Sequence, residues 1–168
     1  MLHDYGISLN EPSGWHTRFY RIVSPVTSPV TVQAATVPFV DSDLSTFQVE
    51  TCAQLGPKDA LLIALVYEPV SPAQVWAPSV VTSFAGFSFR PGDFGQIMGL
   101  PANQVQARRT FTVANRVCEL IACFGSDNPD IGTVNTIIAS LRTLRVREAA
   151  SKEANGQAAE VVFPMNLP

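Results

Sequence analysis

Hydrophobic and polar residues alternate along several stretches of the chain, and this period of two is typical of strands with one buried face. The alternation predicts strands over residues 6–9, 15–22, 31–39, 104–113 and 116–124. The first two read as a hairpin, because Pro12 and Gly14 mark a turn between them. The last two form the clearest hairpin, since Asn115 between them readily adopts a positive φ.

Two further stretches have helical rather than strand periodicity. Residues 43–55 carry apolar side chains at near-helical spacing and end at the helix-stopping pair Gly56 and Pro57. Asn128 is expected to cap a second helix, which carries an apolar stripe as far as Leu144. The apolar run 60–67 predicts a central strand covered on both faces, so helices lie on at least one face of the sheet.

Length and charge exclude several classes of protein. The chain has 168 residues, a net charge of −3 and 15% charged residues, which predicts one folded domain over residues 1–146 with a polar extension over 147–168. A mildly acidic domain is a poor candidate for nucleic-acid binding. No apolar run is long enough to span a membrane, and the first residues lack a signal peptide, so we expect a cytoplasmic protein.

Residues suited to catalysis or metal binding are sparse. The spacing of Cys52, Cys118 and Cys123 fits no zinc pattern, and we expect three reduced, buried thiols. His3 and His16 are the only histidines, and no nucleophile or phosphate-binding motif accompanies them. We therefore expect no enzyme, no cofactor and no metal.

Glu119 is the one acidic residue that the pattern places on a strand face shared with apolar neighbours. If that face is buried, the carboxylate needs a cationic partner, such as Arg109 or Arg21. An exposed carboxylate and a functional acid are the alternatives that remain open.

Three motifs occur in the order found in one known family. They are GISLNEPSGWHTRFY near the start, RRTFTVANRVCELIACFGS in the closing hairpin, and NTIIASLRTL in the final helix. Over about residues 5–146 the chain resembles the PsbP-like and Mog-like family, which includes photosystem accessory subunits, a Ran-binding import factor and bacterial lipoproteins. The resemblance implies a bacterial member with an α+β fold, in which an antiparallel sheet is flanked by helices as an α/β/α sandwich. It also implies binding rather than catalysis.

Residues 69–101 are rich in proline, glycine and aromatic side chains, and predict irregular loops around one short strand at 83–89. Exposed aromatic patches mark interaction sites, so the hypothetical partner-binding residues are Trp76, Phe84, Phe94, Arg108 and Arg109. In one alternative the rings simply cover the open side of the sheet, and in another the arginines discourage strand pairing at a solvated edge.

The function predicted from the sequence is a non-catalytic protein-interaction or accessory domain that binds a protein partner, with no nucleic acid and no membrane span. The alternative is a carrier of a small apolar ligand, held in a pocket between the sheet and the helix at 43–55. The apolar segment Val161–Phe163 leaves docking as an added strand, or self-association as a homodimer, as further possibilities.

Overall fold

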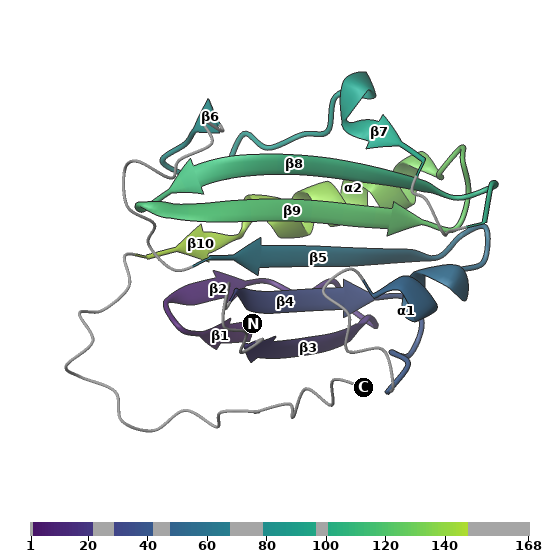
Figure 1. Ribbon diagram of the computed structural model, residues 1–168, viewed down its shortest axis with the longest axis horizontal. Coiled ribbons are helices and arrows are strands. Elements are labelled where there is room, and N and C mark those ends of the chain that lie inside the picture. The colour runs from purple at the N-terminus through teal and green to yellow at the C-terminus, as the bar shows by residue number, and fades with distance from the viewer. Residues whose placement is uncertain (1, 22–28, 42–47, 68–78, 97–100, 148–168) are drawn as a thin grey trace, which may run out of the picture.

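A computed structural model describes residues 2–21, 29–41, 48–67, 79–96 and 101–147. Within these residues the protein is mostly β-structure, with one large sheet, one small sheet and two α-helices (Figure 1). The α-helices are α1 (Val49–Ala53) and α2 (Ile131–Arg142), and a 3-10 turn, η2, covers Pro91–Asp93.

The main sheet has seven strands in the order β3-β4-β5-β9-β8-β6, with β7 also paired to β8. The strands are β3 (His16–Arg21), β4 (Val30–Ala35), β5 (Ala60–Val66), β6 (Ser79–Val80), β7 (Phe94–Gly95), β8 (Val105–Val113) and β9 (Arg116–Phe124). Every pair is antiparallel except β6 with β8, which is parallel. All seven residues of β5 are buried, which confirms the prediction of a central strand covered on both faces.

The first face of the main sheet is the one against which α2 packs; Figure 1 shows this helix behind β8 and β9. Ile137 and Leu141 of α2 are fully buried in the same apolar cluster as Leu62 of β5 and Leu120 of β9. The helix begins after Asp130, whose carboxylate accepts a hydrogen bond of 3.0 Å from the Thr133 amide. The cap therefore lies two residues beyond the predicted Asn128, because the Asp130 side chain reaches the third helical amide.

The second face is covered differently. Cys52 of α1 and Leu55 just beyond it pack on Leu61, Ile63 and Ile121 of the sheet. Helix α1 has five residues, and it is the only helix on this face in the part of the chain that the structure describes. Part of the predicted helix over 43–55 is thus present, while residues 42–47 lie outside the described residues.

A small second sheet contains β1 (Leu2–Asp4), β2 (Ile7–Leu9) and β10 (Arg145–Val146). Strand β2 pairs with β1 and β10 and not with β3, so the predicted hairpin between the first two strands is wrong. The physical reason is that Ile7 and Leu9 bury their side chains in the first-face core. Asn10, just beyond β2, is hydrogen-bonded to Ser140 and Thr143 at the end of α2.

The predicted fold class is also wrong. The chain does not form an α/β/α sandwich around a purely antiparallel sheet; it forms a β-rich fold with a mixed sheet and one substantial helix on one face, in the residues described. The apolar alternation of a strand shows that a face is buried, but not whether a helix, a loop or a second sheet covers it. Likewise, strand direction depends on long connections that leave no local pattern, as for β6.

The hairpin of β8 and β9 is confirmed, with Ala114 and Asn115 at φ 48° and 56° in its turn. The strand predicted at 83–89 is wrong, since β6 and β7 lie on either side of this segment. Its aromatic rings pack together on the first face instead: Phe84 and Phe87 both contact Phe111 edge to face.

Candidate functional site

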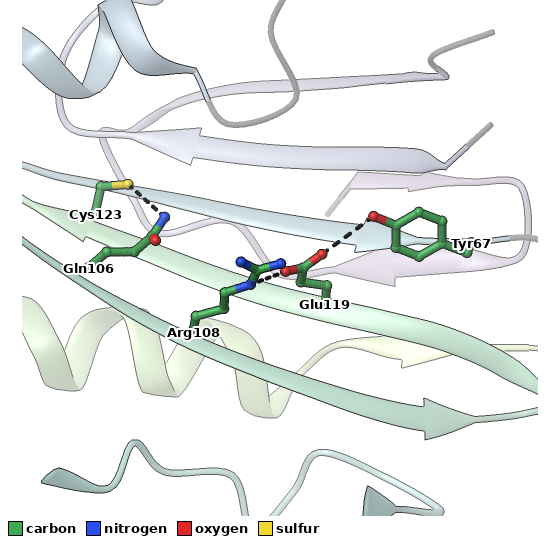
Figure 2. Close-up of polar contacts among 5 residues, drawn as sticks. All are labelled: Tyr67, Gln106, Arg108, Glu119 and Cys123. Carbon is green, nitrogen blue, oxygen red and sulfur yellow. Dashed lines mark hydrogen bonds and ion pairs between the residues drawn. The ribbon is translucent and has the colours of Figure 1, made fainter. Parts of the chain in front are cut away.

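A row of polar side chains crosses the second face where β5, β9 and β8 run side by side (Figure 2). The Glu119 carboxylate lies between its two partners: Oε1 pairs with Nε of Arg108, and Oε2 accepts a hydrogen bond of 3.4 Å from the Tyr67 hydroxyl. We call Tyr67, Glu119 and Arg108 the polar row. It links three ionisable side chains on this face of the sheet.

The register of the strands explains how the polar row forms. Glu119 of β9 lies directly opposite Thr110 of β8, and Arg108 is two residues along β8, so both side chains project from one face. Tyr67 immediately follows β5, and its amide donates to the Val117 carbonyl of β9 at 2.9 Å. The pairing of three strands thus brings together residues separated by up to 52 positions in the chain.

Burial differs sharply across the polar row. The Glu119 side chain is 7% exposed, whereas that of Arg108 is 55% exposed. A buried carboxylate needs a charged or hydrogen-bonding partner, and Arg108 supplies one while part of its side chain stays in water. The pair therefore fixes an arginine at the surface of the sheet in one orientation.

Glutamine and cysteine side chains continue the row along the same two strands. Nε2 of Gln106 lies 3.6 Å from Sγ of Cys123, its direct cross-strand neighbour (Figure 2). Gln106 is half-buried, while Thr110 on the other side of Arg108 is exposed. From Gln106 to Thr110, the margin of the second face is a polar strip that solvent reaches.

Tyr67 of the polar row has a shifted pKa, and so does Cys118 on the opposite face of β9. Burial, and then the Glu119 carboxylate, raise the pKa of the Tyr67 hydroxyl. Burial raises the pKa of the Cys118 thiol to about 12. Both shifts favour the neutral form, which is the less reactive form of a phenol or a thiol. All three cysteines are free and buried, as predicted.

A second polar cluster lies on the same face across β3 and β4. Nε of Arg18 donates to Gln33 at 2.6 Å, and the same guanidinium contacts Gln48 and lies over the Phe39 ring at 4.1 Å. Gln33 in turn donates to the Tyr20 hydroxyl at 2.9 Å. The second face therefore has an apolar centre with polar side chains toward both margins.

The residues predicted to bind a partner separate in the structure. Arg108 lies on the second face, but its neighbour Arg109 lies on the first face, because adjacent residues of a strand point to opposite sides. Arg109 donates to the Ser88 carbonyl at 2.9 Å and lies over the Phe111 ring at 4.8 Å. It thereby fastens the aromatic segment to β8.

The predicted aromatic residues also lie on the first face or outside the described residues. Phe84 is 2% exposed, and Phe94 is half-buried between Phe89 and Phe124. These contacts match the alternative in which the rings cover the sheet. Trp76 lies outside the described residues, and partner binding by these three side chains stays a prediction.

The partner of Glu119 is Arg108, and not the predicted Arg109 or Arg21. The expectation that the Glu119 carboxylate is paired is confirmed. The register of the β8 and β9 hairpin decides which arginine lies on the same face as Glu119. Sequence reasoning missed Tyr67 and Gln106 altogether. Counting outward from the Asn115 turn would have placed Arg108 and Gln106 on the face of Glu119, because the side-chain period is two.

No group of His, Cys, Asp and Glu suited to holding a metal ion occurs among the described residues. None of the helices in that part of the chain combines the length and the apolar character needed to cross a membrane.

No known protein family, curated protein or solved structure matches this chain. The resemblance to the PsbP-like and Mog-like family therefore stays a prediction, and its implied sandwich architecture is replaced by the fold described above.

Proposed function

We propose that this chain is a non-catalytic protein-interaction domain that binds a partner protein at the β8 margin of the second face. The strip runs along Gln106, Arg108 and Thr110, and Arg108 is its anchor. The partner would present hydrogen-bond acceptors, carboxylates or backbone carbonyls, to the exposed part of the guanidinium.

One observation carries this proposal: a half-exposed arginine is held in place by a buried carboxylate. Binding costs free energy to immobilise long side chains, about 0.5–1.5 kcal/mol for each. Arg108 is already oriented by Glu119, so this cost is reduced before any partner arrives. Arginine is also among the residues most enriched at the energetic centres of protein interfaces.

The chemistry of the polar row supports binding over catalysis. A nucleophile or general base works best with a pKa near the working pH. Within the polar row, the pKa of the Tyr67 hydroxyl is raised away from neutrality. The Tyr67 hydroxyl donates to Glu119, an arrangement that disfavours the phenolate.

The packing beneath α1 favours an interaction domain over a ligand carrier. A carrier pocket between sheet and helix would need open volume there, typically about 300 Å³ or more. Cys52 and Leu55 instead belong to one apolar cluster with Leu61, Ile63 and Cys123, and each is at most 5% exposed.

The proposal is tested by capturing the partner at the strip and then measuring affinity with purified components. A photo-crosslinking amino acid at Thr110 captures the neighbouring protein in cells, which is then purified for calorimetric titration. Arg108→Ala should weaken binding about 30-fold, since loss of an interface anchor costs about 2 kcal/mol and each 1.4 kcal/mol is tenfold. Arg108→Lys should recover only part of the loss, because lysine lacks the planar fork.

Arg147→Ala is the matched control, because it removes an exposed arginine beside the small sheet. Its affinity should equal that of the wild type, and urea unfolding should confirm that all variants remain folded. Equal affinity of Arg108→Ala and Arg147→Ala would contradict the proposal, as would the absence of any cross-linked partner at Thr110.

A further inference from the structure

Strand β3 forms one edge of the main sheet, and among the described residues no strand pairs with its outer side. The Thr36 amide donates to the Ala60 carbonyl at 3.0 Å, so the even-numbered residues of β4 bond to β5. In an antiparallel sheet the odd-numbered residues of β4 then bond to β3. By the register, the backbone groups of Thr17 and Phe19 point outward, toward the place of an additional strand.

The edge strand is also the least buried of the long strands. None of the six residues of β3 is fully buried, whereas all six of β4 are. A long edge with available amides invites pairing with other chains, and folded proteins usually cover or block such an edge. Strand β3 itself contains two arginines, Arg18 toward the second face and Arg21 toward the first, and no acidic residue. One carboxylate contacts it, because the Thr17 hydroxyl donates to Glu11 at 2.8 Å.

The chain leaves the described structure close to this edge. The Arg147 amide donates to the Gly6 carbonyl at 2.8 Å. The adjacent Tyr5 stacks on Phe19 of β3 with ring centroids 6.0 Å apart, and the guanidinium of Arg21 lies 5.9 Å from the same ring. The chain that follows Arg147 therefore starts next to Gly6 and Tyr5, and Tyr5 contacts β3 from the first face.

The sequence beyond Arg147 contains one segment with the composition of a strand. Residues 159–163 read Ala-Glu-Val-Val-Phe, and β-branched and aromatic residues favour strands. The intervening residues 148–158 can span up to about 40 Å, well beyond the short path along Gly6 and Tyr5. Over residues 148–163, three glutamates and one lysine give a net charge of −2, opposite to the arginines of β3.

We propose that residues 159–163 add to the outer edge of β3 as a further strand of the main sheet, within the same molecule. Backbone hydrogen bonds to Thr17 and Phe19 supply the affinity, as in other cases of strand addition. Glu160 beside the arginines supplies the electrostatic preference. Closing a loop of this length costs little more than closing a shorter one, because the entropy grows only with the logarithm of length.

Amide hydrogen exchange of the full chain, read by NMR at low and high protein concentration, tests the proposal. The amides of Thr17 and Phe19 should exchange slowly in the wild type, at a rate independent of protein concentration. Val162→Pro removes a backbone donor in the added strand and should accelerate both amides by about tenfold or more. Glu160→Lys should accelerate them less, since it leaves the backbone donors in place.

Ala150→Pro is the matched control, because it places proline in the same extension but outside the added strand; it should leave both amides protected. Unchanged exchange in β5 would show that each variant is folded. Free exchange of Thr17 and Phe19 in the wild type would overturn the proposal. So would protection that appears only at high concentration, which would indicate a second copy, or protection that survives Val162→Pro.

Discussion

On the first face of the main sheet, Arg109 lies over aromatic rings and holds a loop, whereas on the second face Arg108 is half exposed and paired with a buried carboxylate. The two residues are adjacent in the sequence and identical in chemistry. What differs is the cover of each face: α2 and an aromatic cluster on the first, the short α1 and polar side chains on the second.

This contrast shows how one sheet can separate stability from recognition. The first face buries large apolar groups, and such burial stabilises a fold by about 25 cal/mol for each Å² removed from water. The second face keeps polar groups at its margins, where they satisfy one another and leave Arg108 in contact with solvent. Substitutions on the two faces should therefore have different consequences.

The largest effect is expected from Phe111→Ala on the first face. Phe84, Phe87 and the Arg109 guanidinium all rest on this ring, so its loss leaves a cavity and loosens the aromatic segment. Urea unfolding should show a loss of about 3–5 kcal/mol. Val80→Ala, at a site 79% exposed, should change stability by less than about 0.5 kcal/mol. Equal effects of the two would contradict this account of the first face.

A smaller loss is expected from Gly125→Ala, which tests how the cover of the second face is attached. A Cβ at Gly125 would lie 1.9 Å from the Gly56 carbonyl oxygen and 2.8 Å from that of Leu55, just beyond α1. The backbone must shift to relieve this overlap. The free energy of unfolding should therefore fall by about 3 kcal/mol. Gly86→Ala meets no atom within 4 Å and is the matched control. A fully stable Gly125→Ala protein would show that this close approach is not needed.

The smallest effect concerns pH and the polar row. Because the pKa of Tyr67 is raised above its ordinary value of 10.0, the folded protein holds this proton more tightly than the unfolded chain. The contribution of this proton to the free energy of unfolding is fully present below pH 10. It is lost as the pH rises through the raised pKa of Tyr67. Tyr67→Phe lacks this titration and loses only a long hydrogen bond, worth about 0.5 kcal/mol.

The difference in unfolding free energy between wild type and Tyr67→Phe should therefore shrink, or change sign, between neutral pH and about pH 11. Urea unfolding at several pH values measures it, and the other tyrosines titrate in both proteins and cancel. A difference that is constant or grows with pH would show that Tyr67 is not held in the neutral form by its surroundings.

Local sequence patterns were sufficient to predict the long strands, whose residues are many enough to show whether one face or both faces are buried. The apolar run at 60–67 predicted β5, and the alternation around Asn115 predicted β8 and β9 with their turn. The short strands β6, β7 and β10 have two residues each, too few to show any period. Their pairing depends on which edge of a sheet lies nearby once the chain has folded.

The candidate site was predictable only in part for a related reason. A carboxylate among apolar neighbours on β9 required a partner, and this much follows from the cost of burying charge. Tyr67 joins it from 52 residues away because β5 lies next to β9, a pairing that skips β6, β7 and β8. Sequence distance carries no information about such an arrangement.

The amino-acid sequence alone determined the long strands β5, β8 and β9, the burial of three free cysteines, and that a buried glutamate must be paired. Each depends on neighbours within a few residues or on the free energy of a single group. Only the tertiary structure decided which sheet each strand joins, that Arg108 and Arg109 act on opposite faces, and which edge is left for another strand. These outcomes depend on the order and direction of strands, and long-range packing selects among the many pairings that the same local pattern permits.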